Sequence, residues 1–563
     1  MMMQPASVAA STPSVFLEQT QARPVTEVWG RRAMVSSMHP DATAAGLDIL
    51  RAGGHAVDAA VAVATTLAVT NHNWAGLAGD SAWLIYDRRT RSAAHLDGYS
   101  TCPRAMTAQH LAAHFDLDAR VQAAAFAEEP GGFRETGVAI AMAPGTPATL
   151  HAAWRRYGVL PFERLLEPAI DRAANGIVIS SYVAGSLQKS HTKLGSFPAT
   201  RQIFLRSDRS PWSKGELLVQ RDLAETLRRY ARDPEREFSN GRTANLILDC
   251  ARQANAALSA EDLEHYRPVW REPVDGSYRG HRLVTTTPPT AGVHVVQALN
   301  VLEHILPPEL PYGHAQALHL IIEALKCALA DRRISGGDPD HMSIPVSHIV
   351  DKTYARELAR SIDPSAARHI LADSRSTAVG TTHFVVVDEH GNIVSATQSI
   401  GRDFGCGEVA SGTGLVMNDR SWWMSLRDGP NQVAAGRRAN IGHAPTMVFN
   451  ADAPWIVLGS PGGFGIVPYV VQTLTGVIDY GLDLQQAIEA PRFRLMDLEY
   501  TVACEDRFDR AILDELRSRG HRIDLFPPWS DRVGGVEGVQ RDRATGHLLA
   551  GVDPRRNSYA AGY

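Results

Sequence analysis

A threonine pair at the start of an apolar stretch is the feature that most constrains this chain. Gly380, Thr381 and Thr382 lead into a strand-forming run at 383–387, a polar Asp-Glu-His-Gly-Asn segment at 388–392 and a second strand-forming run at 393–397. Two such runs joined by a short polar turn predict a β-hairpin. Thr381 therefore precedes the first strand of a hairpin. On this pattern alone it is an ordinary strand residue, because threonine suits strands.

Thr381 has a second interpretation, which depends on cleavage of the bond before it. A chain that began at Thr381 would carry a hydroxyl and a free α-amine on one residue. The amine, whose ordinary pKa is about 8, can act as the base that activates an otherwise poor nucleophile. Residues 373–380 are polar and lack long apolar side chains, as expected of an exposed segment that can be cut.

Apolar spacing along the rest of the chain predicts alternating helices and strands. We expect helices at 42–51, 59–67, 149–157, 165–175, 217–231, 315–332 and 484–490, with Asp58 capping the second of them. We expect strands at 82–86, 137–143, 384–387, 393–397, 412–417, 446–449 and 455–458. The first 30 residues lack the cationic start and apolar core of a signal peptide and are predicted to form a flexible leader.

Composition excludes several classes of protein. A net charge of −5 provides no general attraction to nucleic acid or acidic membranes, and no apolar run reaches the length of a membrane span. The five cysteines are scattered and form no CxxC pair, so neither a disulfide framework nor a zinc knuckle is indicated. We therefore expect a cytoplasmic protein with neither a nucleic-acid nor a membrane partner.

Three motifs are spaced along the chain. They are the segment 37–60, which contains LRAGGHAVDAA at 50–60, the TTHF segment at 381–384 with Asp388, and GSPGG at 459–463. Together they resemble the γ-glutamyltransferase family of N-terminal nucleophile hydrolases. A supporting stretch runs from 144 to 176. The motifs occur in the family's order, and the resemblance covers the chain from about residue 35 to its C-terminal region.

The resemblance implies an α+β fold, a four-layer αββα sandwich, made as a precursor that cuts itself between Gly380 and Thr381. After the leader, residues 31–380 would form the large fragment and residues 381–563 the small one, held together as a heterodimer that can pair again. Thr381 would attack an amide carbonyl, and water or an acceptor amine would release the acyl group. No cofactor or metal is expected, because His72, His383 and His390 have no partner at metal-ligand spacing.

Further catalytic residues follow from the same resemblance. Ser399 matches a second hydroxyl residue that contacts the nucleophile, where the family commonly has threonine, and Thr397 is a weaker candidate on the same strand face. Gly462 and Gly463 match the pair that stabilises the oxyanion. Without the resemblance, Ser399 would be a polar strand residue and the glycines a tight turn.

The substrate-binding positions depart from the family. Tyr99 stands where the family has the arginine that binds the glutamyl carboxylate, Gly401 replaces an asparagine, Trp423 replaces an acidic residue, and Ile-Gly at 441–442 replaces a serine pair. A pocket that loses these partners no longer compensates both charges of a γ-glutamyl group. We therefore expect glutathione-like compounds to be poor substrates, and the pattern resembles the oxamate amidohydrolase type.

A small, carboxylate-bearing acyl group would fit a pocket narrowed by Tyr99 and Trp423. Arg402 or Arg420 could pair with its carboxylate, although either could equally be a solvated surface side chain. Two alternatives stay open. The chain could be a true γ-glutamyltransferase or glutathione hydrolase, or an inactive relative that serves as a binding protein and is never cut.

Overall fold

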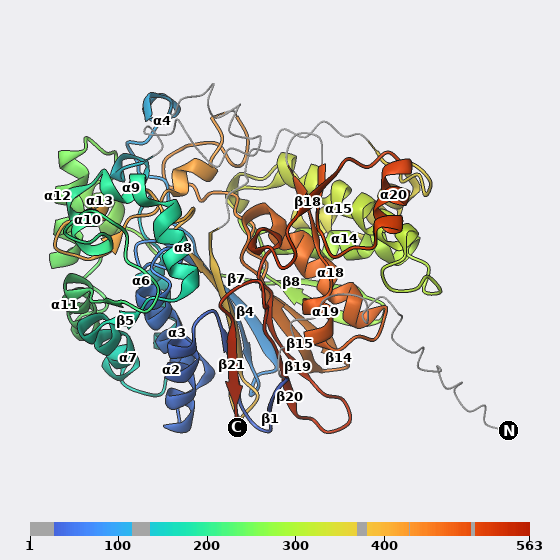
Figure 1. The fold of residues 1–563 in the computed structure, drawn as a ribbon, viewed down its shortest axis with the longest axis horizontal. Coiled ribbons are helices and arrows are strands. Elements are labelled where there is room, and N and C mark those ends of the chain that lie inside the picture. Colours follow the sequence, from blue (N-terminus) through green and yellow to red (C-terminus); the bar gives the residue numbers. More distant parts are fainter. Residues whose placement is uncertain (1–26, 115–135, 369–379, 427, 497–500) are drawn as a thin grey trace.

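A computed structural model describes residues 27–114, 136–368, 380–426, 428–496 and 501–563. Two large sheets lie face to face at the centre of these residues, with helices on either side (Figure 1). Each sheet has seven strands, and every strand runs antiparallel to its neighbours. This is the four-layer αββα sandwich, an α+β fold, that the resemblance implies.

The first sheet contains the strand that follows Thr381. Its order is β21 (Tyr559–Gly562), β2 (Met34–Ser37), β10 (Thr382–Val387), β11 (Ile393–Ser399), β3 (Asp80–Asp87), β4 (Ser92–Gly98) and β7 (Val269–Arg271). The second sheet has the order β1 (Val28–Gly30), β20 (Leu548–Gly551), β19 (Glu537–Arg541), β15 (Ala453–Gly459), β14 (Thr446–Asn450), β9 (His281–Thr285) and β8 (Val274–Tyr278).

Helices cover the outer face of each sheet (Figure 1). Those on the side of the first sheet are α2 (Pro40–Arg51), α3 (Ala56–Thr70), α6 (Thr146–Tyr157), α7 (Phe162–Asn175), α8 (Ser181–Lys189), α9 (His191–Gly195), α10 (Pro198–Phe204), α11 (Arg221–Arg232), α12 (Arg242–Gln253) and α13 (Ala260–Glu264). Those on the side of the second are α14 (Gly292–Ile305), α15 (Ala315–Ser335), α16 (Val346–Ile349), α17 (Lys352–Arg360), α18 (Ile466–Ile478), α19 (Leu484–Glu489) and α20 (Arg510–Ser518).

Shorter elements complete the described part of the chain. They are helix α4 (Ala108–His114), the small strands β5 (Ile177–Val178), β6 (Leu217–Leu218), β12 (Val409–Ala410), β13 (Leu415–Val416), β16 (Phe493–Met496), β17 (Thr501–Glu505) and β18 (Ile523–Phe526), and the 3-10 turns η2 (Val138–Ile140), η3 (Pro339–His341), η4 (Arg420–Trp423), η5 (Gly463–Gly465) and η6 (Asp531–Val533).

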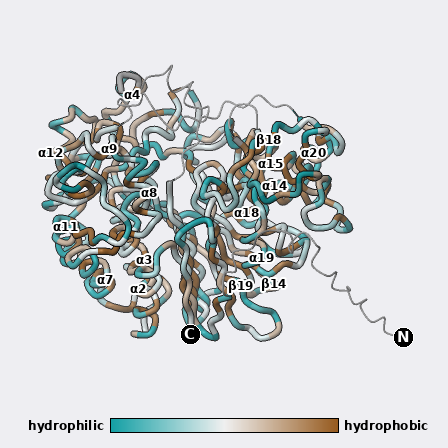
Figure 2. The backbone as a smooth tube through the Cα atoms, in the orientation of Figure 1, coloured by the Kyte–Doolittle hydropathy of each residue, from teal (hydrophilic) through white to brown (hydrophobic). Residues whose placement is uncertain are grey.

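Strand β10 is central to the first sheet and buried on both faces. Val385 and Val387 point between the sheets, where they join apolar side chains of the second sheet such as Met447. Phe384 and Val386 point the other way, into the core beneath α3. Burying each such side chain stabilises the fold by about 1.5–3 kcal/mol. Apolar residues accordingly run through the strands and along their flanking helices (Figure 2).

Most of the predicted elements form, and the hairpin of β10 and β11 is confirmed. The strand predicted at 137–143 is wrong: Gly137 has a φ of 96°, and a 3-10 turn follows it. The helix predicted from 217 begins at Arg221, because Leu217 and Leu218 instead pair with β5. The helix predicted at 59–67 begins at Ala56, and Asp58 lies inside its first turn in a capping box with His55.

The predicted flexible leader and the predicted exposed segment at 373–380 lie largely outside the described residues. The described end of the leader is ordered, because β1 pairs with β20. Of the segment 373–380, only Gly380 is described. The five cysteines are buried and unpaired, and no helix in the described residues is long and apolar enough to cross a membrane.

Candidate active site

Four neighbouring strands of the first sheet bring polar residues to one end of the sandwich. Thr381 directly precedes β10, and Ser399 is the last residue of β11. Asp80, the first residue of β3, lies opposite Ser399 in the ladder. Strand β4 ends at Gly98, so Tyr99 leaves the sheet at the same end. Antiparallel pairing thus gathers residues from distant parts of the sequence at a single edge.

The predicted nucleophile and its predicted partner are in contact. The Thr381 hydroxyl donates a hydrogen bond to Oγ of Ser399 across 3.0 Å, and the backbone N–H of Gly401 donates to the same oxygen across 3.1 Å. Both threonine and serine are buried. Thr397, the weaker candidate, lies 2.8 Å from Nδ1 of His383 instead. The strand register therefore brings Ser399, not Thr397, to Thr381.

The backbone at the predicted cleavage point is strained. The chain is continuous through Gly380 and Thr381, and Thr381 has a φ of 103°. A left-handed φ in a β-branched residue is rare and costs on the order of 1–3 kcal/mol. Gly380 is needed for a different reason: a Cβ atom there would collide with the carbonyl oxygen of Gly401. The left-handed conformation therefore lies at Thr381 and not at Gly380.

The predicted oxyanion pair follows β15 at the same end of the sandwich. The ring of His383, two residues beyond Thr381, packs against Gly459 at the end of β15. Gly462 and Gly463 come next, with φ values of 126° and 60°, which glycine adopts readily. Their left-handed backbone opens the 3-10 turn η5.

His383 is not available as a strong base. Its Nδ1 contacts the Thr397 hydroxyl, and its Nε2 lies 3.2 Å from the hydroxyl of Ser395. Burial lowers the pKa of His383 to about 3, so the ring is neutral and weakly basic at physiological pH. The α-amine that cleavage would free on Thr381 is thus the better base.

One of the predicted substrate-binding residues, Arg420, forms a buried ion pair with Asp80. Nη2 of Arg420 lies 2.6 Å from Oδ1 of Asp80, and both side chains are almost fully buried. Burial raises the pKa of Asp80 to about 6, and Arg420 opposes the rise. The guanidinium lies 5.8 Å from the ring centroid of Trp423. The interpretation of Arg420 as a surface residue is therefore wrong, and its head group has an anionic partner.

The other predicted arginine also has a carboxylate partner. Nε of Arg402 lies 2.8 Å from Oδ2 of Asp419, and the guanidinium stacks over the ring of Trp422 at 4.4 Å. Asp419 also fills the space beside Gly401, where any Cβ atom would collide with its carboxylate. The position at which the family places an asparagine thus admits no side chain here.

Sequence reasoning missed Asp80, Arg332 and His443 as parts of this region. Arg332 lies on α15, a helix that the sequence predicted from its apolar spacing. Its charged side chain is nevertheless only 2% exposed. His443 follows Gly442, which approaches the carbonyl of Gly463, and the His443 ring packs on Tyr99 at 5.4 Å. The charge of Arg332 was the one available signal, and it pointed to no particular partner, because the buried face of α15 also contains Glu323 and Lys326.

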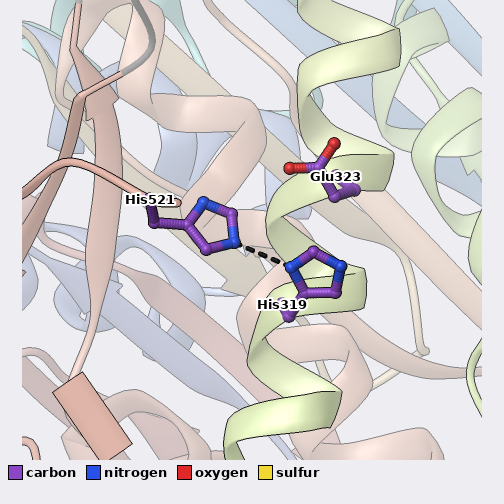
Figure 3. A group of neighbouring side chains, drawn as sticks. All are labelled: His319, Glu323 and His521. Atoms are coloured by element: carbon purple, nitrogen blue, oxygen red, sulfur yellow. Dashed lines mark hydrogen bonds between the residues drawn. The ribbon is translucent and has the colours of Figure 1, made fainter. Parts of the chain in front are cut away.

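A separate group of potential metal ligands lies between α15 and the segment after α20 (Figure 3). Nδ1 of His319 lies 2.8 Å from Nε2 of His521, and the other ring nitrogen of His319 contacts the carbonyl of Asp363. The third member, Glu323, accepts a hydrogen bond from the ammonium of Lys326 across 2.7 Å. These contacts occupy the atoms that a metal would need and place a cation beside the carboxylate, so we assign this group a structural role.

Two stacked antiparallel sheets between helical layers, with a threonine at the head of a central strand, define the fold of the N-terminal nucleophile hydrolases. The profile of the family described as Gamma-glutamyltranspeptidase matches residues 42–563. The chain belongs to this family.

Named relatives in the family are hydrolases and acylases. The chain is 31% identical to the "Glutathione hydrolase proenzyme" of Escherichia coli, over 99% of this chain and 96% of that protein. It is 33% identical to the "Acylase ACY 1 proenzyme" of Pseudomonas sp. strain SE83, over 90% and 89%. The crystal structure of cephalosporin acylase from Bacillus halodurans superimposes with a TM-score of 0.85 at 28% identity, covering 100% of this chain and 99% of that one.

The contact between Thr381 and Ser399 leads to a first prediction. Ser399→Ala removes the hydroxyl that holds the threonine side chain, so both self-cleavage and amide hydrolysis should slow by about 100-fold. Thr397→Ala is the matched control, because it removes a hydroxyl from the same face of β11 that contacts His383 instead. Equal loss in the two variants, measured by fragment formation and initial rates, would contradict the assignment of Ser399.

Proposed function

We propose that this protein is a self-processing threonine amidohydrolase that acts on a small, non-glutamyl amide such as oxamate through an acyl-threonine intermediate. The observation that carries the proposal is the Thr381–Ser399 hydrogen bond at the strained head of β10. Membership of the family adds support, because its named relatives are hydrolases and acylases.

Self-cleavage would come first. Oγ1 of Thr381 attacks the carbonyl carbon of Gly380, the peptide C–N bond breaks, and the nitrogen becomes the α-amine of Thr381. Water then hydrolyses the resulting ester, leaving a carboxylate on Gly380. The left-handed φ of Thr381 supports this step, because cleavage would release a strained backbone conformation. The products would be fragments 1–380 and 381–563, held together by the shared first sheet.

Amide hydrolysis would use the same hydroxyl. The α-amine accepts its proton as Oγ1 forms a bond to the amide carbon, and the backbone N–H groups of Gly462 and Gly463 stabilise the oxyanion. The C–N bond breaks, the proton passes to the leaving amine, and the acyl group remains on Thr381. Water, activated by the same amine, releases the acid. An acceptor amine in place of water would give acyl transfer.

The changed pocket supports a substrate other than a γ-glutamyl compound. Tyr99, Gly401 and Trp423 offer no pair of opposite charges for the two ends of an amino acid. We infer that Arg420 and Arg402 lie near the acyl group, with their charges balanced by Asp80 and Asp419.

Glutathione hydrolysis is the second candidate, favoured by the 31% identity to the Escherichia coli glutathione hydrolase proenzyme. The remaining alternative, a binding protein that is never cut, would show neither self-cleavage nor amide hydrolysis.

The rate should depend on pH through the α-amine. The amine must be neutral to accept a proton, so kcat at saturating oxamate should rise about tenfold per pH unit below its ordinary pKa of about 8 and level off above it. His383, with a pKa of about 3, and Asp80, with a pKa of about 6, cannot produce an inflection there. Initial rates between about pH 6 and 9 check this. A rate that is constant across the range would contradict the amine as base.

An acid quench tests the proposed chemistry directly. Enzyme mixed with oxamate and quenched in acid should carry an oxalyl group on fragment 381–563, detected by intact mass and located by peptide mapping to Thr381. The adduct should be absent from enzyme quenched without substrate. Turnover of oxamate without any adduct on Thr381 under single-turnover conditions, or an adduct on another residue, would overturn the mechanism.

A further inference from the structure

Arg332 is a buried cation with no anionic partner among the residues that the structure describes. It lies on α15 and is 2% exposed. Its Nε donates to Oδ1 of Asn440 across 3.2 Å, whereas Nη1 and Nη2 are buried and make no hydrogen bond within the described part. Buried guanidinium groups are normally paired, because burying an uncompensated charge is costly.

The other two arginines of the region show the contrast. Arg402 and Arg420 each lie within 2.8 Å of an aspartate oxygen. At Arg332, burial lowers the pKa to about 9, and the opposing influence comes from Tyr99, a neutral hydroxyl at physiological pH. Arg332 thus stays charged at neutral pH and has four terminal N–H groups to offer.

The position of Arg332 links it to the candidate active site. Its guanidinium lies 4.2 Å from the ring centroid of Phe464, the residue that follows Gly463. Phe464 packs in turn on Trp423 at 5.4 Å. Asn440, which holds Nε, lies two residues before Gly442, and Gly442 approaches the carbonyl of Gly463. Nη1 and Nη2 of Arg332 therefore lie near the turn that contains Gly462 and Gly463, the predicted oxyanion pair.

Other unpartnered polar atoms accompany this cation. The Tyr99 hydroxyl and both ring nitrogens of His443 are buried and make no hydrogen bond within the described residues. Burial keeps His443 neutral by lowering its pKa and keeps Tyr99 protonated by raising its pKa. Each can donate one hydrogen bond. A forked cation with two neutral donors suits a planar anion with two oxygens, which is a carboxylate.

We propose that Arg332 binds the carboxylate of the substrate's acyl group, assisted by the hydroxyl of Tyr99 and the imidazole of His443. The proposal deepens the proposed function and rests on it, because it assigns the substrate class as amides whose acyl part bears a carboxylate. The cation that the family resemblance would place at position 99 comes here from α15 instead. Arg332 would thus determine substrate specificity.

Equilibrium binding of oxalate separates this proposal from the chemistry at Thr381. Calorimetry on the intact wild-type enzyme should detect oxalate, which has two carboxylates and no amide to cleave. Arg332→Met should weaken this binding by about 100-fold, and Arg332→Lys by less, because lysine keeps the charge but not the fork. Arg333→Met, a neighbouring exposed position on α15, is the matched control and should bind oxalate like wild type.

Turnover of two substrates excludes a merely structural effect. Arg332→Met should lose about 100-fold in kcat/KM on oxamate, mainly through KM, and change less than about threefold on neutral oxamide. Equal losses on both amides, or unchanged oxalate binding in Arg332→Met and Arg332→Lys, would overturn the proposal. Wild-type enzyme that cleaves neither amide would contradict the proposed function. Even then, loss of oxalate binding in Arg332→Met but not in Arg333→Met would support a carboxylate site at Arg332.

Discussion

Thr381→Ala should leave the protein as a single uncut chain of 61.1 kDa and reduce amide hydrolysis by about 10⁴-fold or more. The substitution removes the hydroxyl that would attack both the Gly380 carbonyl and the substrate. It also removes the hydrogen bond from Thr381 to the Ser399 hydroxyl. Gel electrophoresis follows cleavage over time, and initial rates on oxamate follow the chemistry.

Two controls show whether the loss is specific to this hydroxyl. Thr381→Ser keeps the nucleophile and should still be cut, although the missing methyl leaves its rotamer less constrained. Thr65→Ala removes another buried threonine hydroxyl, which bonds only within its own helix α3, and should be cut and active. A Thr381→Ala protein that is cut at the wild-type position, or that keeps wild-type activity, would contradict the role of Thr381.

The second large effect concerns substrate choice. We expect kcat/KM for γ-glutamyl-4-nitroanilide to be about 10³-fold below that for the oxalyl anilide with the same leaving group. The α-ammonium of the glutamyl group would be desolvated near Arg332 and Arg420, and the nearby carboxylate of Asp80 is already paired with Arg420. Burying a charge without a partner is the cost that sets this difference.

A matched substrate isolates the effect of the α-ammonium group on the rate of hydrolysis. Glutaryl-4-nitroanilide differs from the γ-glutamyl compound only by lacking the amino group, and we expect it to be cleaved faster. Release of 4-nitroaniline gives all three rates by absorbance. A γ-glutamyl compound that is cleaved faster than both others would show that Tyr99, Gly401 and Trp423 have not abolished glutamate recognition, and the glutathione hydrolase alternative would then hold.

The sequence alone predicts the part of the site that local patterns determine. Two strand-forming runs joined by a polar turn predict the β10–β11 hairpin, and the family resemblance predicts the contact of Thr381 with Ser399. Register explains why this works, since a hairpin with a defined turn fixes which residues face each other. The strand predicted at 137–143 fails because Gly137 starts a 3-10 turn instead.

The pocket was harder to predict because its members come from separate layers. Asp80 meets Arg420 only because β3 lies beside β11 and the turn η4 packs over that end of the sheet. Arg332 comes from a helix on the far sheet, and its unpaired nitrogens are visible only once its neighbours are placed. Long-range contacts of this kind leave no periodic signal in a sequence.

Intact mass spectrometry of the purified wild-type protein is the most direct test of whether Thr381 becomes an N-terminal nucleophile. We expect two species in an active preparation, one of which is the fragment of residues 381–563 with a free threonine at its N-terminus. An active preparation that contains only the uncut chain, or a small fragment that begins at another residue, would contradict Thr381 as a self-exposed nucleophile.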